Sequence, residues 1–413
     1  MSETEVTTAP SPLMLADGRP AALAWSLDPA LRHLNHGSFG AVPLVAQERQ
    51  HRLRAEMERS PVVWFPALPQ RLATSRVDIA AFLGTAPDRL ALVPNASAGV
   101  SVVYASLMHR PRGEIVVTDH GYGAVTMGAQ RLARRWGGRV RTARVPLDAD
   151  EQQAYESVAA ELSEDTALVV VDQITSPTAR RMPVDLIGAE AHRRGIPFLV
   201  DAAHAPGLIA APLAGVQADF WVGNLHKWGC APRGTAALVA QGPLSEHLHP
   251  LIDSWGAADP YPDRFDQQGT VDATAYLAAH TALDFIERTW GWGTARRYMD
   301  DLASYAEQIL TAAFAEVTGS DQPVDVGMPV PGMRLVRLPA ALGASRVEAD
   351  SLRDRVAEEL GVEAAFTSFD GVGYLRLSAH VYNTAADYEY FAEACVPILG
   401  EWARAARETH AAP

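Results

Sequence analysis

Residues 197–227 read PFLVDAAHAPGLIAAPLAGVQADFWVGNLHK and contain two apolar runs that each lead into polar residues. The first run, Pro197–Asp201, ends in an acid, and the second, Asp219–Gly223, is followed directly by Asn224–Lys227. Short apolar runs separated by helical stretches are typical of parallel strands that are buried on both faces of a sheet. Because open α/β sheets bind ligands beyond the carboxyl ends of their strands, these polar residues are the first candidates for a functional site.

The same alternation of strands and helices continues on both sides of this segment. Further strands are predicted at Glu114–Thr118, Ala167–Val171 and Ala236–Val239, and helices at Leu44–Arg59, Pro69–Leu83, Val100–Met108 and Val271–Thr289. The later part mixes the two patterns at Met333–Leu338, Val347–Leu360, Gly373–Ser378 and Ala385–Ala405. We therefore expect an α/β protein with a disordered tail over residues 1–15, a large domain over 16–299 and a smaller α+β domain over 300–413.

The composition of the 413 residues excludes several classes of protein. A formal net charge of −14 and the lack of any basic run argue against nucleic-acid binding. No apolar stretch is long enough to cross a membrane, and the acidic, polar N-terminus does not resemble a signal peptide. The two cysteines, Cys230 and Cys395, make neither a disulfide framework nor a Cys/His metal cluster. We expect a cytoplasmic protein without a metal.

The pair Asp201 and Lys227 carries the strongest chemical signal. The two residues are 26 positions apart and each follows a predicted strand. A buried acid is costly unless a cation meets it, and the protonated nitrogen of a pyridine ring is such a cation. A lysine beside the same ring could form a Schiff base with its aldehyde. The pair therefore predicts a site for pyridoxal 5′-phosphate (PLP), in which Asp201 keeps the ring an effective electron sink.

Neighbouring residues suit the other groups of this cofactor. His204 could reach the phenolic oxygen of the ring, and Asn224 and His226 could hydrogen-bond its phosphate. Ala96 and Ser97 begin a predicted helix, where backbone N–H groups and a hydroxyl could complete a phosphate cradle. Taken singly, each residue has an ordinary interpretation, since a lone lysine is usually a surface charge and a lone histidine is often structural. Their combination at the ends of strands favours a PLP site.

Several motifs in the same order resemble a known family. The runs are LNHGSFG at Leu34–Gly40, PNASAG at Pro94–Gly99, ITSPT at Ile174–Thr178, DAAHAPG at Asp201–Gly207, NLHKWGCAPR at Asn224–Arg233, GTVDATAYL at Gly269–Leu277 and RLSAHVYNT at Arg376–Thr384. Together they resemble class V aminotransferases of PLP fold type I. Within this family, they resemble most specifically the isopenicillin N epimerase-like branch, which is related to cysteine desulfurases and hercynylcysteine sulfoxide lyases. The resemblance implies a large domain built on a mostly parallel seven-stranded sheet between helices.

The resemblance also implies residues that would bind an amino-acid substrate. Arg376 matches the arginine that holds the α-carboxylate, a task for which its planar guanidinium group is suited. Asn35, His36 and Ser38 fall where the N-terminal segment of the family covers the substrate.

Further roles toward the cofactor follow from the same resemblance. Thr270 matches a residue that reaches the phosphate bound by the other subunit, which implies a homodimer with shared active sites. Either His120 or Tyr122 is expected to stack on the ring, with Tyr122 slightly favoured. Ser176 or Thr175 lies where the family contacts the phenolic oxygen or the substrate.

The reaction itself is left open by the sequence. Cysteine desulfurases need a thiol shortly before the arginine, and Phe366–Tyr374 contains no cysteine, so persulfide formation is disfavoured. Cys230 is expected to be a buried packing residue. The leading hypothesis is β-elimination from a cysteine S-conjugate in specialised metabolism. The alternatives are an epimerase of the isopenicillin N epimerase type, an aminotransferase or oxidative deaminase, and a non-catalytic scaffold, which would have little reason to keep Asp201, Lys227 and Arg376 together. The substrate is not predicted.

Overall fold

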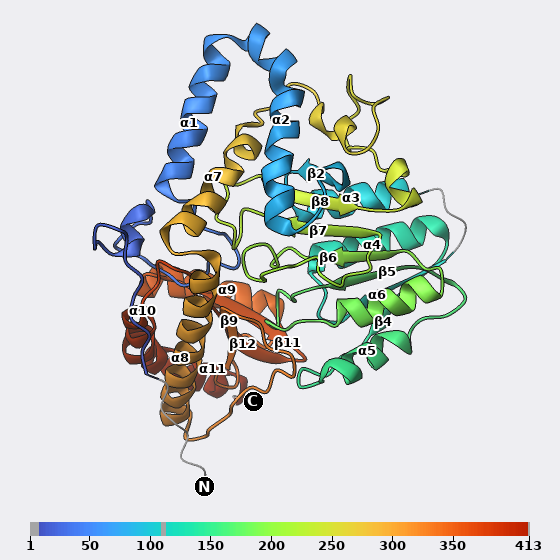
Figure 1. Cartoon of the computed structure of the whole chain (residues 1–413). Helices are drawn as coiled ribbons and strands as arrows, with labels where there is room; N and C mark the ends of the chain where they lie inside the picture. The colour runs from blue at the N-terminus through green and yellow to red at the C-terminus, as the bar shows by residue number, and fades with distance from the viewer. Residues whose placement is uncertain (1–7, 109–112, 412–413) are drawn as a thin grey trace. The chain divides into compact units, whose positions relative to one another are not determined.

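The computed structural model describes residues 8–108 and 113–411, and the first seven residues of the expected tail lie outside it (Figure 1). The described chain divides into two compact units. The larger unit comprises residues 40–176 and 181–288, and the smaller comprises the residues up to 39, residues 177–180 and the residues from 289 onward. Within the rest of the expected tail, Met14 forms an isolated bridge with Pro20.

The larger unit is built on a sheet of seven strands in the order β2-β8-β7-β6-β5-β3-β4. The strands are β2 Leu90–Val93, β3 Glu114–Thr118, β4 Val140–Ala143, β5 Thr166–Asp172, β6 Phe198–Asp201, β7 Phe220–Asn224 and β8 Ala236–Ala240. Neighbours from β4 to β7 pair in parallel, whereas β8 runs antiparallel to both β7 and β2. The prediction of a mostly parallel seven-stranded α/β sheet is therefore confirmed.

Two further strands, β2 and β4, complete the sheet beyond the five that the apolar runs predict. Val140–Ala143 reads VRTA, and its side chains are mostly half-buried, because β4 lies at the edge of the sheet. A strand of this kind carries little apolar signal. Leu90–Val93 is a fully buried run of four residues, too short to separate from the helix that follows it by sequence pattern alone.

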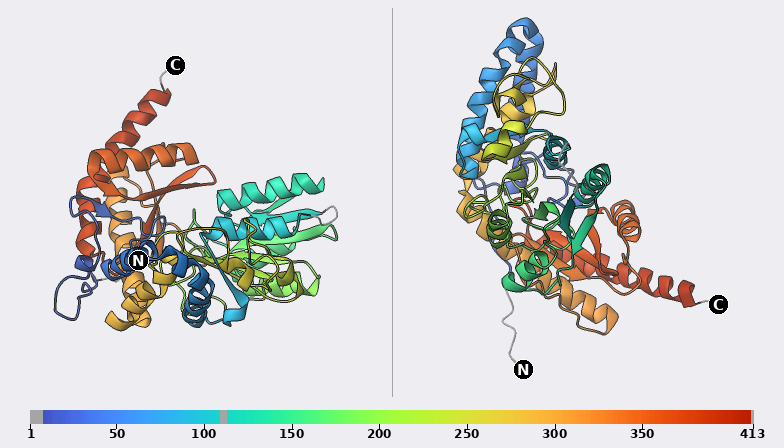
Figure 2. Two further views of the ribbon diagram at one scale, coloured as in Figure 1. Left: turned by 90° about the horizontal axis from the view of Figure 1, so that it is seen from above. Right: turned by 90° about the vertical axis from the view of Figure 1, so that its right-hand side faces the viewer.

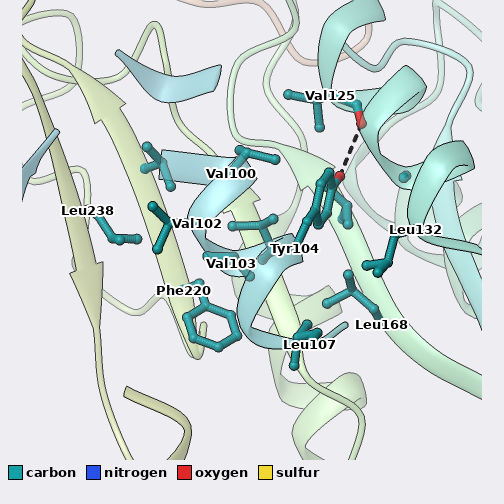
Figure 3. Close-up of a cluster of buried hydrophobic side chains, with 14 of the residues drawn as sticks. Val100, Val102, Val103, Tyr104, Leu107, Val125, Leu132, Leu168, Phe220 and Leu238 are labelled. Atoms are coloured by element: carbon teal, nitrogen blue, oxygen red, sulfur yellow. Dashed lines mark hydrogen bonds between the residues drawn. The ribbon is translucent and has the colours of Figure 1, made fainter. Parts of the chain in front are cut away.

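Alternate residues along the strands supply two apolar layers. Ile115 and Val117 of β3 belong to one core with side chains of the helices α3 Ala96–Ser106 and α4 Gly123–Trp136. Figure 3 shows part of this core, with Val103 and Tyr104 of α3 near Leu132 of α4. In the middle of this core, the Tyr104 hydroxyl donates a hydrogen bond to the carbonyl oxygen of Val125 at 3.1 Å. Val116 lies between them in sequence and is equally buried. Burial on both faces explains the continuous apolar runs that mark these strands in the sequence.

The remaining helices of this unit are α1 Leu44–Arg59, α2 Pro61–Leu83, α5 Glu151–Ala159, α6 Val184–Arg193 and α7 Thr274–Thr289, which ends at the border of the unit. Figure 2 gives two further views of them. The predicted end of the first helix at Arg59 is confirmed. The second begins at Pro61, eight residues before its predicted start at Pro69. Proline is favoured in the first turn of a helix, where its missing N–H has no partner to lose, so Pro61 starts α2 as well as separating it from α1.

The smaller unit combines helices with an antiparallel sheet. Its three main strands lie in the order β11-β12-β9. They are β9 Met333–Arg337, β11 Ala365–Phe369 and β12 Val372–Ser378, and a separate parallel pair joins β1 Arg32–His33 to β10 Val362–Glu363. The helices are α8 Trp292–Thr318, α9 Arg346–Leu360, α10 Ala385–Tyr390 and α11 Val396–Ala411, the last two linked by one π-helical turn. Within the described residues, no helix combines the length and apolar character needed to cross a bilayer.

Candidate active site

Asp201 and Asn224 end adjacent strands at the same edge of the sheet. β6 and β7 are parallel neighbours, and Asp201 lies opposite Val222. The Asp201 carboxylate is 2% exposed and accepts a hydrogen bond from the N–H of Ala203 at 3.0 Å. Burial raises the pKa of Asp201, while the Ala203 N–H and the positive charge of Lys227 act in the opposite direction. The acid and the lysine that the sequence pairs therefore lie close enough to interact.

Lys227 lies in a tightly closed connection between β7 and the antiparallel β8. The pair Asn224 and Ala236 closes the base of this connection. Inside it, the N–H of Leu225 donates to the carbonyl of Thr235 at 3.1 Å, and the N–H of Cys230 donates to the carbonyl of Lys227 at 2.9 Å. These hydrogen bonds fix the backbone from which the lysine side chain extends.

The amine of Lys227 meets His204, and Trp228 fixes that histidine. The Lys227 Nζ lies 3.0 Å from His204 Nε2, and the indole N–H of Trp228 donates to His204 Nδ1 at 3.2 Å. An indole nitrogen can only donate, so Nδ1 carries no proton and the neutral ring carries its proton on Nε2. In this tautomer, assigned from the partners, Nε2–H faces the Lys227 nitrogen and donates to it when the amine is uncharged. The uncharged amine is also the form that attacks an aldehyde.

The N-terminus of α3 lies beside the end of β7. The N–H of Ala96 donates to Asn224 Oδ1 at 2.8 Å, and Asn95 caps the helix by accepting from the N–H of Ala98 at 2.8 Å. Within the described chain, the N–H of Ser97 has no hydrogen-bond partner, and this residue is exposed. A helix N-terminus with an available N–H and a neighbouring hydroxyl suits a phosphate group. The Asn224 oxygen is used by Ala96, so toward a phosphate this side chain can offer its amide N–H₂ group.

His226 lies in the same connection as Lys227 and is largely buried. Its Nδ1 donates to the carbonyl oxygen of Thr235 at 2.8 Å. Burial, together with the nearby positive charges of Lys227 and Arg233, lowers the pKa of His226 to about 4, although the hydrogen bond to Thr235 acts in the opposite direction. The imidazole is therefore neutral near pH 7, with its proton on Nδ1.

A second acid, which the sequence analysis missed, completes this edge of the sheet. Asp172 ends β5 and lies directly opposite Asp201 on β6. It is 3% exposed, and its Oδ2 accepts a hydrogen bond from the N–H of Tyr122 at 3.0 Å. The argument that singles out Asp201, an acid ending a buried strand, applies equally to Asp172 and could have found it.

The residues considered for ring stacking differ sharply in their surroundings. His120 is fully buried, and its Nε2 donates to the carbonyl oxygen of Val145 at 2.7 Å. Tyr122 is 41% exposed, and its backbone N–H donates to Asp172 beside the carboxylate pair.

The residues predicted for the other cofactor contacts also differ in exposure. Thr175 is buried and Ser176 is half-buried in the segment that follows β5. Thr270 is exposed in the loop before α7.

The predicted substrate residues gather in the smaller unit. Arg376 lies on β12, the central strand of its sheet, and is 3% exposed. Its Nη2 donates to Asn35 Oδ1 at 3.2 Å and to Ser38 Oγ at 2.8 Å. His36 shares a hydrogen bond of 2.8 Å with the Tyr382 hydroxyl. The structure thus brings Arg376 together with the N-terminal segment that the sequence assigned to the same task.

The thiols are placed as structural residues. Cys230 and Cys395 are both buried. Burial raises the pKa of the Cys230 thiol, and it raises the pKa of the Cys395 thiol to about 11. A thiol in this state is a poor nucleophile, because the thiolate is the reactive form.

The residues of the larger unit fit PLP on chemical grounds. One edge of the sheet presents a lysine amine, a buried carboxylate able to meet a ring cation, and a helix N-terminus able to bind a phosphate. Each of these groups matches a different part of the cofactor.

Comparisons with known proteins agree with this assignment. The model of the family "Aminotransferase class-V" matches residues 67–391. Isopenicillin N epimerase of Streptomyces clavuligerus is 32% identical, and the match covers 94% of this chain and all of that protein. A probable chloroplastic L-cysteine desulfhydrase of Arabidopsis thaliana is 27% identical, with 89% of this chain and 82% of that protein covered.

A solved structure shares the fold. It is a mutant of C-DES with glycine covalently linked to the PLP cofactor, and the match has a TM-score of 0.75 at 19% identity over 92% of this chain and 99% of that one. The fold, the paired acid and lysine, and the family match over most of the chain all lead to one assignment: the chain belongs to the class-V aminotransferase family and is a PLP-dependent enzyme.

Proposed function

We propose that the protein cleaves the Cβ–S bond of a cysteine S-conjugate by β-elimination. The observation that carries this proposal is the state of the two thiols, both buried and both with a raised pKa. A desulfurase keeps the sulfur as a persulfide on a reactive thiol, and neither cysteine of this chain suits that role. Sulfur removed from a substrate would therefore leave as a free thiol. The relatedness to L-cysteine desulfhydrases adds support.

In this reaction, bound PLP would supply an electron sink for the negative charge that develops on the α-carbon. The Lys227 amine takes the α-proton, because an uncharged amine beside the reacting carbon is a suitable general base. His204, 3.0 Å from the lysine nitrogen, helps to hold this side chain in place. The electron pair of the former C–H bond forms the Cα–Cβ double bond, and the Cβ–S pair leaves with the sulfur, which takes up a proton. Addition of water to the remaining fragment gives pyruvate and ammonium, so atoms and charge balance.

Other residues are assigned to binding. Arg376 would hold the substrate carboxylate, and Asn35 and Ser38, which orient its guanidinium group, would keep it in position. Tyr122 would stack on the ring, because it is exposed while His120 is buried and bonded to Val145.

Further roles complete the cofactor site. Ser97, through its N–H and hydroxyl, and Asn224, through its amide N–H₂ group, would hold the phosphate. Ala96 and His226 would lie beside it without donating, because the Ala96 N–H is bonded to Asn224 Oδ1 and the proton of the neutral His226 ring is bonded to Thr235. His204 would face the phenolic oxygen, and Ser176 or Thr175 would lie beside it.

We also propose a homodimer in which Thr270 reaches the phosphate bound by the partner. Large apolar side chains of the larger unit are exposed, including Trp255 at 94%, Val62 at 85% and Val63 at 69%. These exposed apolar side chains are ones that such an interface would cover.

An amino-acid epimerase is the second candidate, because the identity to isopenicillin N epimerase reaches 32% over nearly the whole chain. It would use the same proton abstraction but return a proton to the α-carbon from the other face.

The two candidates give different products. We expect incubation of the PLP-loaded protein with S-alkyl cysteines to release pyruvate and ammonium in equal amounts, measured by coupled assay. Lys227→Ala, which lacks the base, should release neither. An epimerase would form no pyruvate but would exchange the α-proton of its substrate for deuterium in heavy water, so exchange without pyruvate across the series would refute the lyase proposal.

A further inference from the structure

Asp172 and Asp201 form a pair of buried carboxyl groups on adjacent parallel strands. They are in direct register, and their exposed fractions are 3% and 2%. Residues in register on neighbouring parallel strands carry their side chains on the same face of the sheet, so the two carboxyl groups are neighbours. Two carboxylates cannot share a hydrogen bond without a proton, because each would only accept. Two negative charges this close in a buried site are also strongly unfavourable, so the pair retains one proton.

The surroundings decide which acid carries that proton. Asp172 Oδ2 accepts from the N–H of Tyr122, so the Asp172 oxygen that remains is the one able to donate. Asp201 Oδ1 accepts from the N–H of Ala203, and the charge of Lys227 is close enough to favour the ionised form of this acid. Burial and the charge of Asp201 raise the pKa of Asp172 well above its ordinary value.

Burial is the largest influence on both acids and raises the pKa of each. The other groups that act on the pair are Lys227 and the Tyr104 hydroxyl, whose own pKa is raised by burial and by both acids. When Lys227 is neutral its attraction is absent, and the pair holds its proton more tightly.

We propose that Asp172 is a positioning residue of the cofactor site, which carries the single proton of the pair and donates it in a hydrogen bond to Asp201. Asp201 then meets the pyridine nitrogen as an oriented anion with one charge. Asp172 has no contact with the reacting atoms in this role. The inference rests on the proposed role of Asp201 at the ring nitrogen, and it goes beyond that role by assigning a task to the acid behind it.

Asparagine at position 172 is the decisive substitution. Its amide has the shape of a protonated carboxyl group, so Oδ1 can accept from the N–H of Tyr122 while Nδ2 donates to Asp201. Alanine can neither accept from the N–H of Tyr122 nor donate to Asp201. If Asp172 carries the proton, Asp172→Asn preserves the hydrogen bond and Asp172→Ala loses it.

PLP titration of the stripped protein, followed by the visible absorbance of the bound cofactor, measures the effect. Between pH 6 and 9 we expect Asp172→Asn to bind PLP within about threefold of the parent, and Asp172→Ala to bind about tenfold or more weakly, as for loss of a hydrogen bond to a charged group. Equal weakening in both variants, or unchanged binding in Asp172→Ala, would overturn the proposal.

A second measurement needs no cofactor and does not depend on the alanine variant folding. Because the pKa of Asp172 is raised in the folded state, the folded protein binds this proton more tightly than the unfolded chain does. The resulting stabilisation is fully present below the unfolded pKa of 3.8 and is lost as the pH rises through the folded-state pKa. Asparagine does not titrate. The urea midpoint of Asp172→Asn should therefore exceed that of the stripped parent protein by a margin that grows from pH 5 toward pH 9. Parallel curves would contradict a protonated Asp172.

Asp201→Ala separates this inference from the assignment beneath it. It should weaken PLP binding strongly whichever residue stands at 172. If Asp201→Ala binds PLP as well as the parent, the role of Asp201 at the ring fails, and the inference about Asp172 fails with it. Neither result depends on which amino acid the enzyme uses, so the lyase proposal is tested independently.

Discussion

Both ring nitrogens of His204 are in contact with neighbouring side chains, and the two contacts have different consequences. The Trp228 indole fixes the proton on Nε2, and Nε2 in turn orients the Lys227 amine. Trp228 follows the lysine directly in sequence, so the same short segment supplies the nucleophile and the group that sets the tautomer of its neighbour. We infer that this tryptophan acts on the cofactor through His204.

Trp228→Phe tests this role at a position that is completely buried. Phenylalanine keeps most of the packing but leaves His204 Nδ1 without its donor, so either tautomer becomes available. We expect PLP affinity to fall by about two- to tenfold, as for loss of one buried hydrogen bond. The pH at which the visible absorbance of the bound cofactor changes should also shift, which an absorbance titration would measure.

Trp221→Phe is the matched control. Trp221 is also buried, and its indole N–H donates to Gln173 Oε1 at 3.0 Å, away from His204. This variant should lose comparable stability but keep the absorbance titration of the parent. Identical titrations in the two variants would mean that Trp228 has only a structural role.

At the scale of the elements, the position of the site depends on the close approach of α3 to β7. Gly99 lies on the face of α3 that packs against this strand, and a Cβ atom at this position would come within 2.6 Å of Val222 Cγ1. The absence of a side chain at Gly99 therefore allows the helix N-terminus to lie beside Asn224, where the N–H of Ala96 reaches the amide oxygen.

Gly99→Ala should therefore destabilise the protein, although alanine is the better helix former. Overpacking of a core contact commonly costs about 1–3 kcal/mol. Urea unfolding of the stripped protein would show the loss as a lower midpoint. Ser101→Ala, two residues along the same helix and only half-buried, should leave the midpoint almost unchanged. A Gly99→Ala protein as stable as the parent would show that α3 can shift away from the sheet at little cost.

The elements also show what the sequence could and could not predict. The strands before Asp201 and Lys227 are continuous apolar runs because both of their faces are buried, so their ends could be placed to within a residue or two. The edge strand Val140–Ala143 lacks that signal. Asp172 directly follows the predicted run Ala167–Val171, so the argument used for Asp201 could have found it. Its pairing with Asp201 could not be predicted, because the order of β5 and β6 does not follow from one sequence.

At the scale of the whole molecule, the order of the sheet brings distant residues to one edge. Tyr122 follows β3, while Asp172, Asp201 and Asn224 end β5, β6 and β7, and the parallel pairing of these strands aligns their carboxyl ends. Short apolar runs predicted these ends one at a time. The surface that joins one molecule to another leaves no comparable periodic signal in the chain, and so the dimer remains a proposal.

The dimer proposal predicts that Trp255→Arg weakens association. The side chain is 94% exposed in the single chain, so the substitution should not disturb the fold, while burying an unpaired charge in an interface is strongly unfavourable. Light scattering coupled to size-exclusion chromatography should give a dimer for the parent and a larger share of monomer for the variant. A monomeric parent protein would refute the proposal and remove the proposed role of Thr270.

The reversal of direction at β8 has a consequence for how the enzyme recovers its cofactor. Because β8 returns antiparallel beside β7, the segment carrying Lys227 is a loop held shut at its base by the pair Asn224 and Ala236. This closure is made by main-chain hydrogen bonds and does not require bound PLP. The protein without PLP would therefore keep the loop that carries the Lys227 amine. Rebinding of the cofactor would then require its diffusion into the site but no refolding of the loop.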